Sequence, residues 1–323
     1  MRLPQQLVSS PYFQFSDMHE LIIALGDCVD GDEIQEIARL TDLGLPPVTS
    51  REVLGTMLGV NPGILWSFGE HSKRHYTQFS IHKGLGKPPR IIHAPRVGLK
   101  IIQKWLTFHL SAKKKIAPHV YGFVSGRSHI SAAQVHCSAH WVYSVDIKNF
   151  FPTTPLVEIK QAYKTLGYND DSASLLAKLS CLNGYLAQGA PTSPFLSNLV
   201  LSEVDQKLSV LAEMHLVKLS RYADDVVFSG KGDCPSNLPQ EIQTIFERTP
   251  WKLSPDKEEL RKLPNRLKVH GLLVHHKEIR LTKGYRNRIR AYRHLDSTDK
   301  IRFHDRDRIA GHLQYANQID QID

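Results

Sequence analysis

Two adjacent carboxylates, Asp224 and Asp225, stand between two strand-like runs of the chain. Residues 216–221 lead in and residues 226–229 lead out, so the pattern predicts a tight β-hairpin with the acids at its tip. Neighbouring anions repel each other, and such a pair is tolerated mainly where water or a divalent cation neutralises it. An ordinary acidic turn would explain Asp-Asp alone. With the preceding Tyr-Ala, a chance match of the four-residue motif falls well under about 1%.

A third carboxylate, Asp146, ends the β-rich run over residues 141–146. Period-2 alternation leaves one face of this strand for a core and puts Asp146 on the other. Residues 153–155, Thr-Thr-Pro, then predict an N-cap and a first-turn proline for a helix that ends at Gly167. A strand-end residue with only local hydrogen bonds is the alternative interpretation of Asp146.

Three carboxylates on neighbouring strands can hold two Mg²⁺ ions roughly 4 Å apart, one activating an attacking hydroxyl and one stabilising the leaving pyrophosphate oxygen. In-line phosphoryl transfer needs little beyond this positioning and charge neutralisation. The sequence therefore predicts that the same three residues are catalytic and bind the metal: Asp146, Asp224 and Asp225.

Three segments of the chain resemble motifs of reverse transcriptases, and specifically those of bacterial retrons. Residues 144–152 resemble their first catalytic motif, residues 188–194 their nucleotide-pocket motif, and residues 222–225 their YxDD box. Order and spacing also match, from about Leu43 to the end. The resemblance implies RNA-directed DNA polymerase activity and an α+β, right-hand polymerase fold with fingers, palm and thumb.

The expected organisation follows that fold. It comprises a helical N-terminal region (1–75), fingers (76–140), a palm with an antiparallel sheet and the catalytic carboxylates (141–268), and a basic thumb (269–323). Within the N-terminal region, helices are predicted over residues 32–40 and 50–54, with Ser50 as an N-cap.

Further roles follow from the resemblance, residue by residue. Phe151 matches the aromatic gate that excludes a ribose 2′-hydroxyl; its alternative is a core aromatic beside Phe150. Ile147 would offer its backbone carbonyl as an extra metal ligand. Gln188 and Gly189 would form the floor under the incoming nucleotide, whereas a plain Gly/Pro loop is the alternative there.

Cationic residues are expected around the triphosphate. Lys83 and Arg90 match the pair with which the fingers of this family clamp it, and Lys87 is a further candidate; a solvated basic hairpin is the alternative. Lys257 resembles the palm lysine that approaches the leaving pyrophosphate, a plausible general acid. A surface lysine is the commoner explanation of any single Lys.

The net charge of +9 is concentrated in one window of the sequence. Residues 257–293 hold twelve Lys or Arg against three Glu, which points to a phosphate backbone as partner. Inside this window a helix is predicted whose basic stripe would grip an A-form template–primer: Arg286, Arg290 and Arg293. A solvated basic face is the alternative.

Two retron hallmarks are imperfect in this chain. The family's Asn-Ala-x-x-His element is represented by Ala132 to His136, with Ala132 in place of Asn. The family's Val-Thr-Gly at the thumb is represented by Val269-His270-Gly271, and the resemblance places His270 among the nucleic-acid-binding residues. Both departures concern which structured RNA is recognised.

Composition argues against other classes. No run near 18 apolar residues, no charged-then-apolar leader and no lipidation motif is present, so a cytoplasmic protein without membrane insertion is expected. Two His pairs at helical spacing lack the HExxH context of a zinc site. The cysteines are too dispersed to indicate a zinc ribbon or a disulfide framework: Cys28, Cys137, Cys181 and Cys234.

The resemblance implies a specific activity. The enzyme would bind its own structured non-coding RNA, start DNA at a guanosine 2′-hydroxyl, and copy a template segment from dNTPs into a short DNA joined to RNA, in defence against phage. The chain stops soon after the thumb, so any effector is expected on a separate protein. The alternatives are a stand-alone reverse transcriptase of group II intron, diversity-generating or abortive-infection type, and a non-catalytic RNA-binding scaffold.

Overall fold

The computed structural model describes residues 9–82 and 88–321, which divide into two compact units. Unit 1 contains the chain up to Ile116 together with Asn149–Ser202, and unit 2 contains Ala117–Lys148 together with the chain from Glu203. Each unit is thus assembled from two separate stretches of sequence. The four consecutive regions expected from the sequence have other boundaries than these two units, and they remain a proposal.

Unit 1 is mostly helical. Ser50 begins one helix as predicted, since its side chain accepts a hydrogen bond from Val53 N, and Asp30 begins the helix predicted over 32–40 by accepting from Glu33 N. The helices are α2 (Met18–Leu25), α3 (Gly31–Asp42), α4 (Arg51–Leu58), α5 (Pro62–Glu70), α6 (Val97–Leu110), α8 (Phe150–Thr153), α9 (Leu156–Leu166), α10 (Asp170–Ser180) and α11 (Ser193–Val200), with 3₁₀ turns η1 (Gly26–Cys28) and η2 (Ser72–His75).

Two short antiparallel pairs complete unit 1: β1 (Tyr76–Ile81) with β2 (Arg90–Pro95), and β4 (Cys181–Leu182) with β5 (Tyr185–Leu186). In the sequence, β1 ends before the predicted triphosphate ligands Lys83 and Lys87, and β2 begins at the third, Arg90. The core of the unit is a continuous helical cluster that includes Leu40, Leu54, Trp105, Tyr163 and Leu176.

The start of α9 differs from the prediction. Pro155 is the N-cap residue of α9 and not its first helical residue, and no side chain caps this end. Thr154 is buried and donates its hydroxyl hydrogen bond to the Phe150 carbonyl instead, because α8 forms a short helical turn just before. The predicted end of the helix is confirmed, since Gly167 takes the left-handed conformation with φ of +119°.

Unit 2 is built on a four-stranded antiparallel sheet in the order β6-β7-β3-β8. Its strands are β3 (Trp141–Asp146), β6 (Lys218–Tyr222), β7 (Asp225–Gly230) and β8 (Glu259–Lys262). A second antiparallel sheet has the order β11-β10-β9: β9 (Lys268–Val269), β10 (Leu272–His275) and β11 (Glu278–Leu281). The antiparallel sheet expected for an α+β fold is thus confirmed.

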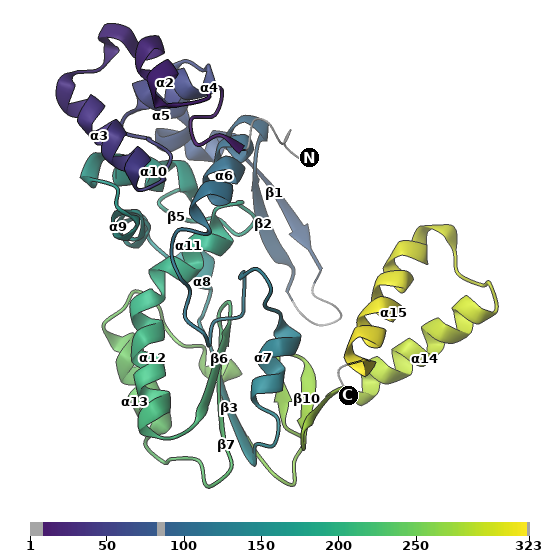
Figure 1. The fold of residues 1–323 in the computed structure, drawn as a ribbon. Helices are drawn as coiled ribbons and strands as arrows, with labels where there is room; N and C mark the ends of the chain where they lie inside the picture. Colours follow the sequence, from purple (N-terminus) through teal and green to yellow (C-terminus); the bar gives the residue numbers. More distant parts are fainter. Residues whose placement is uncertain (1–8, 83–87, 322–323) are drawn as a thin grey trace. The chain divides into compact units, whose positions relative to one another are not determined.

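Helices cover both faces of the four-stranded sheet. Arg221 of β6 bonds to Asp205 on one side, and its neighbour Ser220 bonds to His136 on the other. Because successive residues of a strand point to opposite faces, α12 and α7 lie on opposite faces, as Figure 1 also shows. The helices are α7 (His129–Val135), α12 (Ser202–Met214), α13 (Leu238–Glu247), α14 (Lys283–Ser297) and α15 (Arg306–Asp320), with 3₁₀ turns η3 (Pro255–Lys257) and η4 (Phe303–Asp305).

The basic helix predicted over residues 285–293 is confirmed as part of α14, which pairs with α15 (Figure 1). Ile289 is buried against the core of unit 2, whereas Arg286, Arg290 and Arg293 are exposed. Among the described residues, no helix combines the length and apolarity needed to cross a bilayer.

Candidate active site

The predicted acidic hairpin is formed by β6 and β7. Tyr222 and Asp225 are register partners, so the turn consists of two residues, Ala223 and Asp224. Ala223 takes a left-handed conformation with φ of +58°, which a two-residue hairpin of this kind requires and which side chains other than Gly, Asn and Asp rarely adopt. Asp224 therefore lies in the turn, while Asp225 is the first residue of β7.

Asp146 is the last residue of β3, and its register partner is Asp225. Paired residues on adjacent antiparallel strands place their side chains on the same face, so these two carboxylates lie next to each other. The amide of Ile147 donates to the Asp224 carbonyl at 2.9 Å and ties the hairpin turn to the end of β3. The three predicted acids thus come together at one end of the sheet.

The environment of Asp146 makes its negative charge costly. Partial burial raises its pKa, and the nearby Asp224 and Asp225 raise it further, while the hydrogen bond from Lys257 opposes the shift. A bound cation would offset the repulsion between these neighbouring negative charges. Carboxylate oxygens are also the ligands that Mg²⁺ prefers.

Lys257 lies beside Asp146, the first of the three predicted carboxylates. Its Nζ donates to Asp146 Oδ1 at 2.6 Å, and the loop that carries it is fixed by the Ser254 amide, which donates to the Asp146 carbonyl at 2.8 Å. The Lys257 side chain is 58% exposed, so the ion pair adds little stability and the ammonium can exchange partners. Its role as a general acid remains a prediction.

His270 lies in a place that sequence reasoning missed. Its Nδ1 donates to Asp225 Oδ2 at 2.9 Å, and its side chain is only 3% exposed. This burial does not favour the expected contact with nucleic acid, and we assign His270 to the carboxylates. The only signal in the sequence was the histidine between Val269 and Gly271 where the family has Thr.

Whether the residues fit a divalent cation can be judged from the donor set. Within residues 9–82 and 88–321, no group of three or more His, Cys, Asp or Glu side chains converges tightly enough to hold a metal ion. Asp146 and Asp225 nevertheless each present a carboxylate with one oxygen engaged, by Lys257 and His270 respectively. Carboxylate oxygens are the donors that Mg²⁺ prefers, so the chemistry of this pair fits Mg²⁺.

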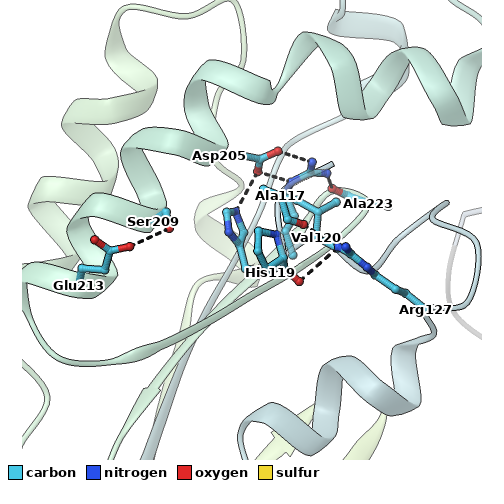
Figure 2. Close-up of polar contacts among 10 residues, drawn as sticks. Ala117, His119, Val120, Arg127, Asp205, Ser209, Glu213 and Ala223 are labelled. Atoms are coloured by element: carbon cyan, nitrogen blue, oxygen red, sulfur yellow. Dashed lines mark hydrogen bonds and ion pairs between the residues drawn. The ribbon is translucent and has the colours of Figure 1, made fainter. Parts of the chain in front are cut away.

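A buried ion pair holds the hairpin from the opposite face of the sheet (Figure 2). The Arg221 guanidinium donates to both carboxylate oxygens of Asp205 at 2.6 Å and to the Ala223 carbonyl at 2.9 Å. Burial would raise the pKa of Asp205, but Arg221 and His119 together outweigh it and lower that pKa below its usual value. Through Arg221, Asp205 of α12 is thus linked to the turn that carries Asp224.

The segment before α7 supports the same turn. Its residues 119–121 exchange backbone hydrogen bonds with Arg221 through a parallel bridge, and Arg127 Nη1 donates to the carbonyls of Ala117 and Val120 at 2.6 Å (Figure 2). At Gly122 a Cβ would overlap the backbone nitrogen of Ala223. No sequence motif had indicated this support.

The nucleotide-binding residues expected from the resemblance belong to unit 1. The Gln188 carbonyl accepts from the His93 amide at 2.8 Å, and Gly189, with φ of +122°, has no room for a Cβ against Ile92 and His93. The absence of a side chain at Gly189 thus allows β2 to approach the backbone closely. The nucleotide contact of both residues remains a prediction.

The other predicted nucleotide ligands are placed as follows. Phe151 is partly buried against the core of unit 1, with its ring centroid 5.6 Å from that of Phe150, so its packing role is real and its gating role remains a prediction. Arg90 is the exposed first residue of β2, paired with Ile81. Lys83 and Lys87 lie outside the described residues.

Comparison with known proteins gives the family. The model of the family described as reverse transcriptase (RNA-dependent DNA polymerase) matches residues 81–282. The Mx65 retron reverse transcriptase of Myxococcus xanthus is 29% identical over 312 residues, which cover 89% of this chain and 72% of the relative.

Two further relatives are the Mx162 retron reverse transcriptase of the same organism, 30% identical, and the Ec86 retron reverse transcriptase of Escherichia coli, 29% identical. The alignments cover 77% and 60% of this chain, and they span 58% and 61% of those relatives. Together with the paired carboxylates of the β6–β7 hairpin and β3, the match over most of its length shows that this chain belongs to the reverse transcriptase family.

Proposed function

We propose that the chain is an RNA-directed DNA polymerase of the retron type. One observation carries the proposal: Asp146 and Asp225 are register partners at the end of a sheet, beside the turn that holds Asp224 and within reach of Lys257. Two adjacent carboxylates with an exposed ammonium beside them suit the transfer of a nucleotidyl group, in which negative charge accumulates on phosphate oxygens.

Each predicted site residue near the carboxylates of unit 2 has a proposed role. Asp146, Asp224 and Asp225 would hold Mg²⁺, with the Ile147 carbonyl as a further ligand; when bound, Mg²⁺ supplies the positive charge that activates the attacking hydroxyl and offsets the leaving pyrophosphate. Lys257, held by Asp146 and exposed, is placed to donate a proton to an oxyanion that arrives at this end of the sheet.

The residues of unit 1 are proposed to receive the nucleotide. Gln188 and Gly189 would form the floor of its pocket, Phe151 would exclude a 2′-hydroxyl, and Arg90 and Lys83 would contact the triphosphate. Guanidinium and ammonium groups suit that anion because they donate charge-assisted hydrogen bonds. The arginines of α14 would contact the phosphate backbone of the RNA–DNA hybrid.

The retron assignment rests on the relatives and on two sequence elements. Three relatives carry the name retron reverse transcriptase, and this chain keeps the histidine of the Ala132–His136 element and the glycine of Val269-His270-Gly271. We propose by analogy a cognate structured RNA, priming at a guanosine 2′-hydroxyl, a DNA product joined to RNA, and a role in defence with a separate effector.

Primer extension on an RNA template with dNTPs and Mg²⁺ tests the polymerase. We expect incorporation by the full chain and its loss in the double variant Asp224→Asn with Asp225→Asn. A matched control replaces two exposed acids of the same unit, Asp233→Asn with Asp296→Asn, and should extend normally. Incorporation that survives in the first variant would exclude this site.

The retron part has a separate test. The chain is co-expressed with the RNA encoded immediately upstream of its gene, and the nucleic acid that co-purifies is analysed. We expect a DNA that remains attached to RNA until an enzyme that hydrolyses 2′,5′-phosphodiester bonds is added. An active polymerase that yields only unattached DNA would instead support the stand-alone reverse transcriptases.

A further inference from the structure

A series of buried hydrogen bonds leads from the end of α7 to the carboxylate of Asp225. The ring of His136, the C-cap residue of α7, lies 2.7 Å from Ser229 Oγ through Nδ1 and 2.7 Å from Ser220 Oγ through Nε2. Ser220 Oγ lies 3.4 Å from Nε2 of His270, whose Nδ1 contacts Asp225 Oδ2 at 2.9 Å. We call these five residues, all in unit 2, the polar relay.

Strand geometry explains why the polar relay can form. Asp225 and Ser229 are separated by an even number of positions on β7, so they share a face of the sheet, and Ser220 of β6 shares that face through its register partner Val227. His136 therefore bridges the two strands of the hairpin. It is fully buried, as are both serines.

The donors and acceptors of the polar relay fit together without a gap. A carboxylate only accepts, so His270 Nδ1 donates to Asp225. Ser220 Oγ bridges His270 Nε2 and His136 Nε2. In a neutral His136 one ring nitrogen donates and the other accepts, so the ring bonds to one of its two serines as a donor and to the other as an acceptor. Each bond fixes the orientation of the next group.

This wiring requires a neutral His136. Burial lowers the pKa of His136 to about 3, and the neighbouring His270 and Lys218 contribute to the shift. One ring nitrogen is therefore always an acceptor. Removing any member would leave the next one buried with an unsatisfied polar group, which destabilises the folded state.

Ser220, His270 and Asp225 lie in the order of a serine nucleophile, its base and an orienting acid. The burial of Ser220 excludes that role, because its side chain is inaccessible to a substrate and its hydroxyl already bonds to His136. The arrangement can only hold groups in place.

We propose that the polar relay positions Asp225 to bind the divalent cation, and that His136 and Ser220 are positioning residues for nucleotidyl transfer. The inference rests on the proposed polymerase function. The bond from His270 to Oδ2 of Asp225 restricts the rotation of the carboxylate, so less rotational freedom is lost when a cation binds the other oxygen. Groups that orient a metal ligand from behind typically change metal affinity or activity by roughly 10–100-fold.

Ser220→Ala tests the proposal, because it removes one hydroxyl from the middle of the polar relay and leaves Asp225 and His270 in place. In primer extension we expect the Mg²⁺ concentration for half-maximal rate to rise roughly tenfold and kcat to fall, while KM for dNTP stays within about twofold. In the metal-free protein, hydrogen exchange at the amides of residues 222–226 should become faster. Ser220→Thr, which keeps the hydroxyl, should restore both.

Tyr163→Phe is the matched control, since it also removes a buried hydroxyl, one that lies 2.8 Å from Ser180 Oγ in unit 1. It should lower thermal stability without changing the Mg²⁺ requirement or the exchange of residues 222–226. If Ser220→Ala behaves like this control, the polar relay is only structural and the proposal is overturned.

Ser229→Ala provides a second variant at the far end of the polar relay, where the serine hydroxyl bonds to the ring of His136. If Ser220→Ala fails to fold, this variant decides the question: a Mg²⁺ requirement raised about threefold supports the proposal, and an unchanged one overturns it. Absence of extension by the unaltered chain would reject the polymerase function, whereas an active chain with unaffected variants rejects the polar relay alone.

Discussion

At the scale of single residues, the hairpin is governed by two polar groups that are buried completely. Arg221 points to one face of the sheet and bonds to Asp205, while Ser220 points to the other and bonds to His136. A buried guanidinium is tolerated only when it is paired and hydrogen-bonded. Buried hydrogen bonds thus hold the hairpin from both faces of the sheet, and the loss of either one would destabilise the folded protein.

Asp205→Asn should therefore destabilise the protein strongly. The variant removes the negative charge that compensates Arg221, whose side chain is 0% exposed, and breaking a buried pair in this way costs about 3–5 kcal/mol. The free energy of unfolding from urea titration measures the change. Asp233→Asn, at an exposed position of the same unit, should change it by less than about 0.5 kcal/mol. A similar value for both variants would show that the pair is not needed.

Phe151→Ala should relax sugar selectivity. If the ring blocks a 2′-hydroxyl, its removal raises ribonucleotide incorporation relative to deoxynucleotide incorporation by about tenfold or more. Because Phe151 also packs against the core of unit 1, stability should fall. Phe150→Ala is the control: this neighbour is buried, so the variant should be less stable without a change in selectivity. Unchanged discrimination in Phe151→Ala would leave packing as its sole role.

At the scale of elements, the active end of the sheet depends on segments that approach it very closely. Residues 119–121 pair with β6 beside Arg221, and Gly122 then passes the hairpin turn with no space for a side chain. On β3, the register with β7 brings Asp146 opposite Asp225. A shift of one residue in the β3–β7 register would turn one of these two carboxylates to the other face.

Gly122→Ala should accordingly impair catalysis. The added Cβ would overlap the backbone of Ala223, so the turn must move, and displacements of about 1 Å can cost up to about 100-fold in rate. Extension rate and circular dichroism together separate a moved turn from an unfolded protein. Gly232→Ala, at a position with open space around it, should be neutral in both measurements. A fully active Gly122→Ala would contradict the tight approach.

Helix α14 is the element that should bind the hybrid. Arg286, Arg290 and Arg293 replaced together by Ala should weaken hybrid binding and reduce the slope of log affinity against log salt by roughly 0.7–0.9 for each phosphate that is no longer neutralised. Arg293 also bonds to Asp320 of α15, so its share should be the smallest. Fluorescence anisotropy at several salt concentrations measures the slope.

The charge-matched control for this variant removes three cations of unit 1: Lys160, Lys164 and Lys178. Each of them is paired with a carboxylate, so we expect a smaller effect on binding. Equal salt slopes in the two triple variants would identify α14 as a solvated basic surface.

At the scale of the whole molecule, the chain forms two units with separate cores, and the positive charge is concentrated in one of them. Residues 257–293, which carry the net charge of +9, all belong to unit 2, as do the three carboxylates proposed to be catalytic. The nucleotide-pocket motif belongs to unit 1. The expected division into four consecutive regions did not anticipate that the first catalytic motif, 144–152, crosses from one unit to the other at residue 149.

Local patterns in the sequence predicted many of the helices, strands and turns. Alternation predicted β3, turn residues predicted the hairpin, Ser50 predicted the start of α4, and helical spacing predicted α14 with its exposed arginines. These features depend on residues a few positions apart, and their physical causes act over the same short range. The three-acid motif also predicted Mg²⁺-dependent nucleotidyl transfer, because few residue types bind Mg²⁺.

Only the tertiary structure decided what surrounds those acids. His136 and Ser220 are 84 positions apart and His270 lies 45 positions beyond Asp225, so no local pattern connects them. Likewise, the sequence pattern indicates nucleic-acid binding for His270 and no particular role for Arg221, because burial depends on which segments pack over a residue. The sequence specified the reacting groups, and packing between distant segments set their orientation, since a buried polar group is stable only where folding brings it a partner.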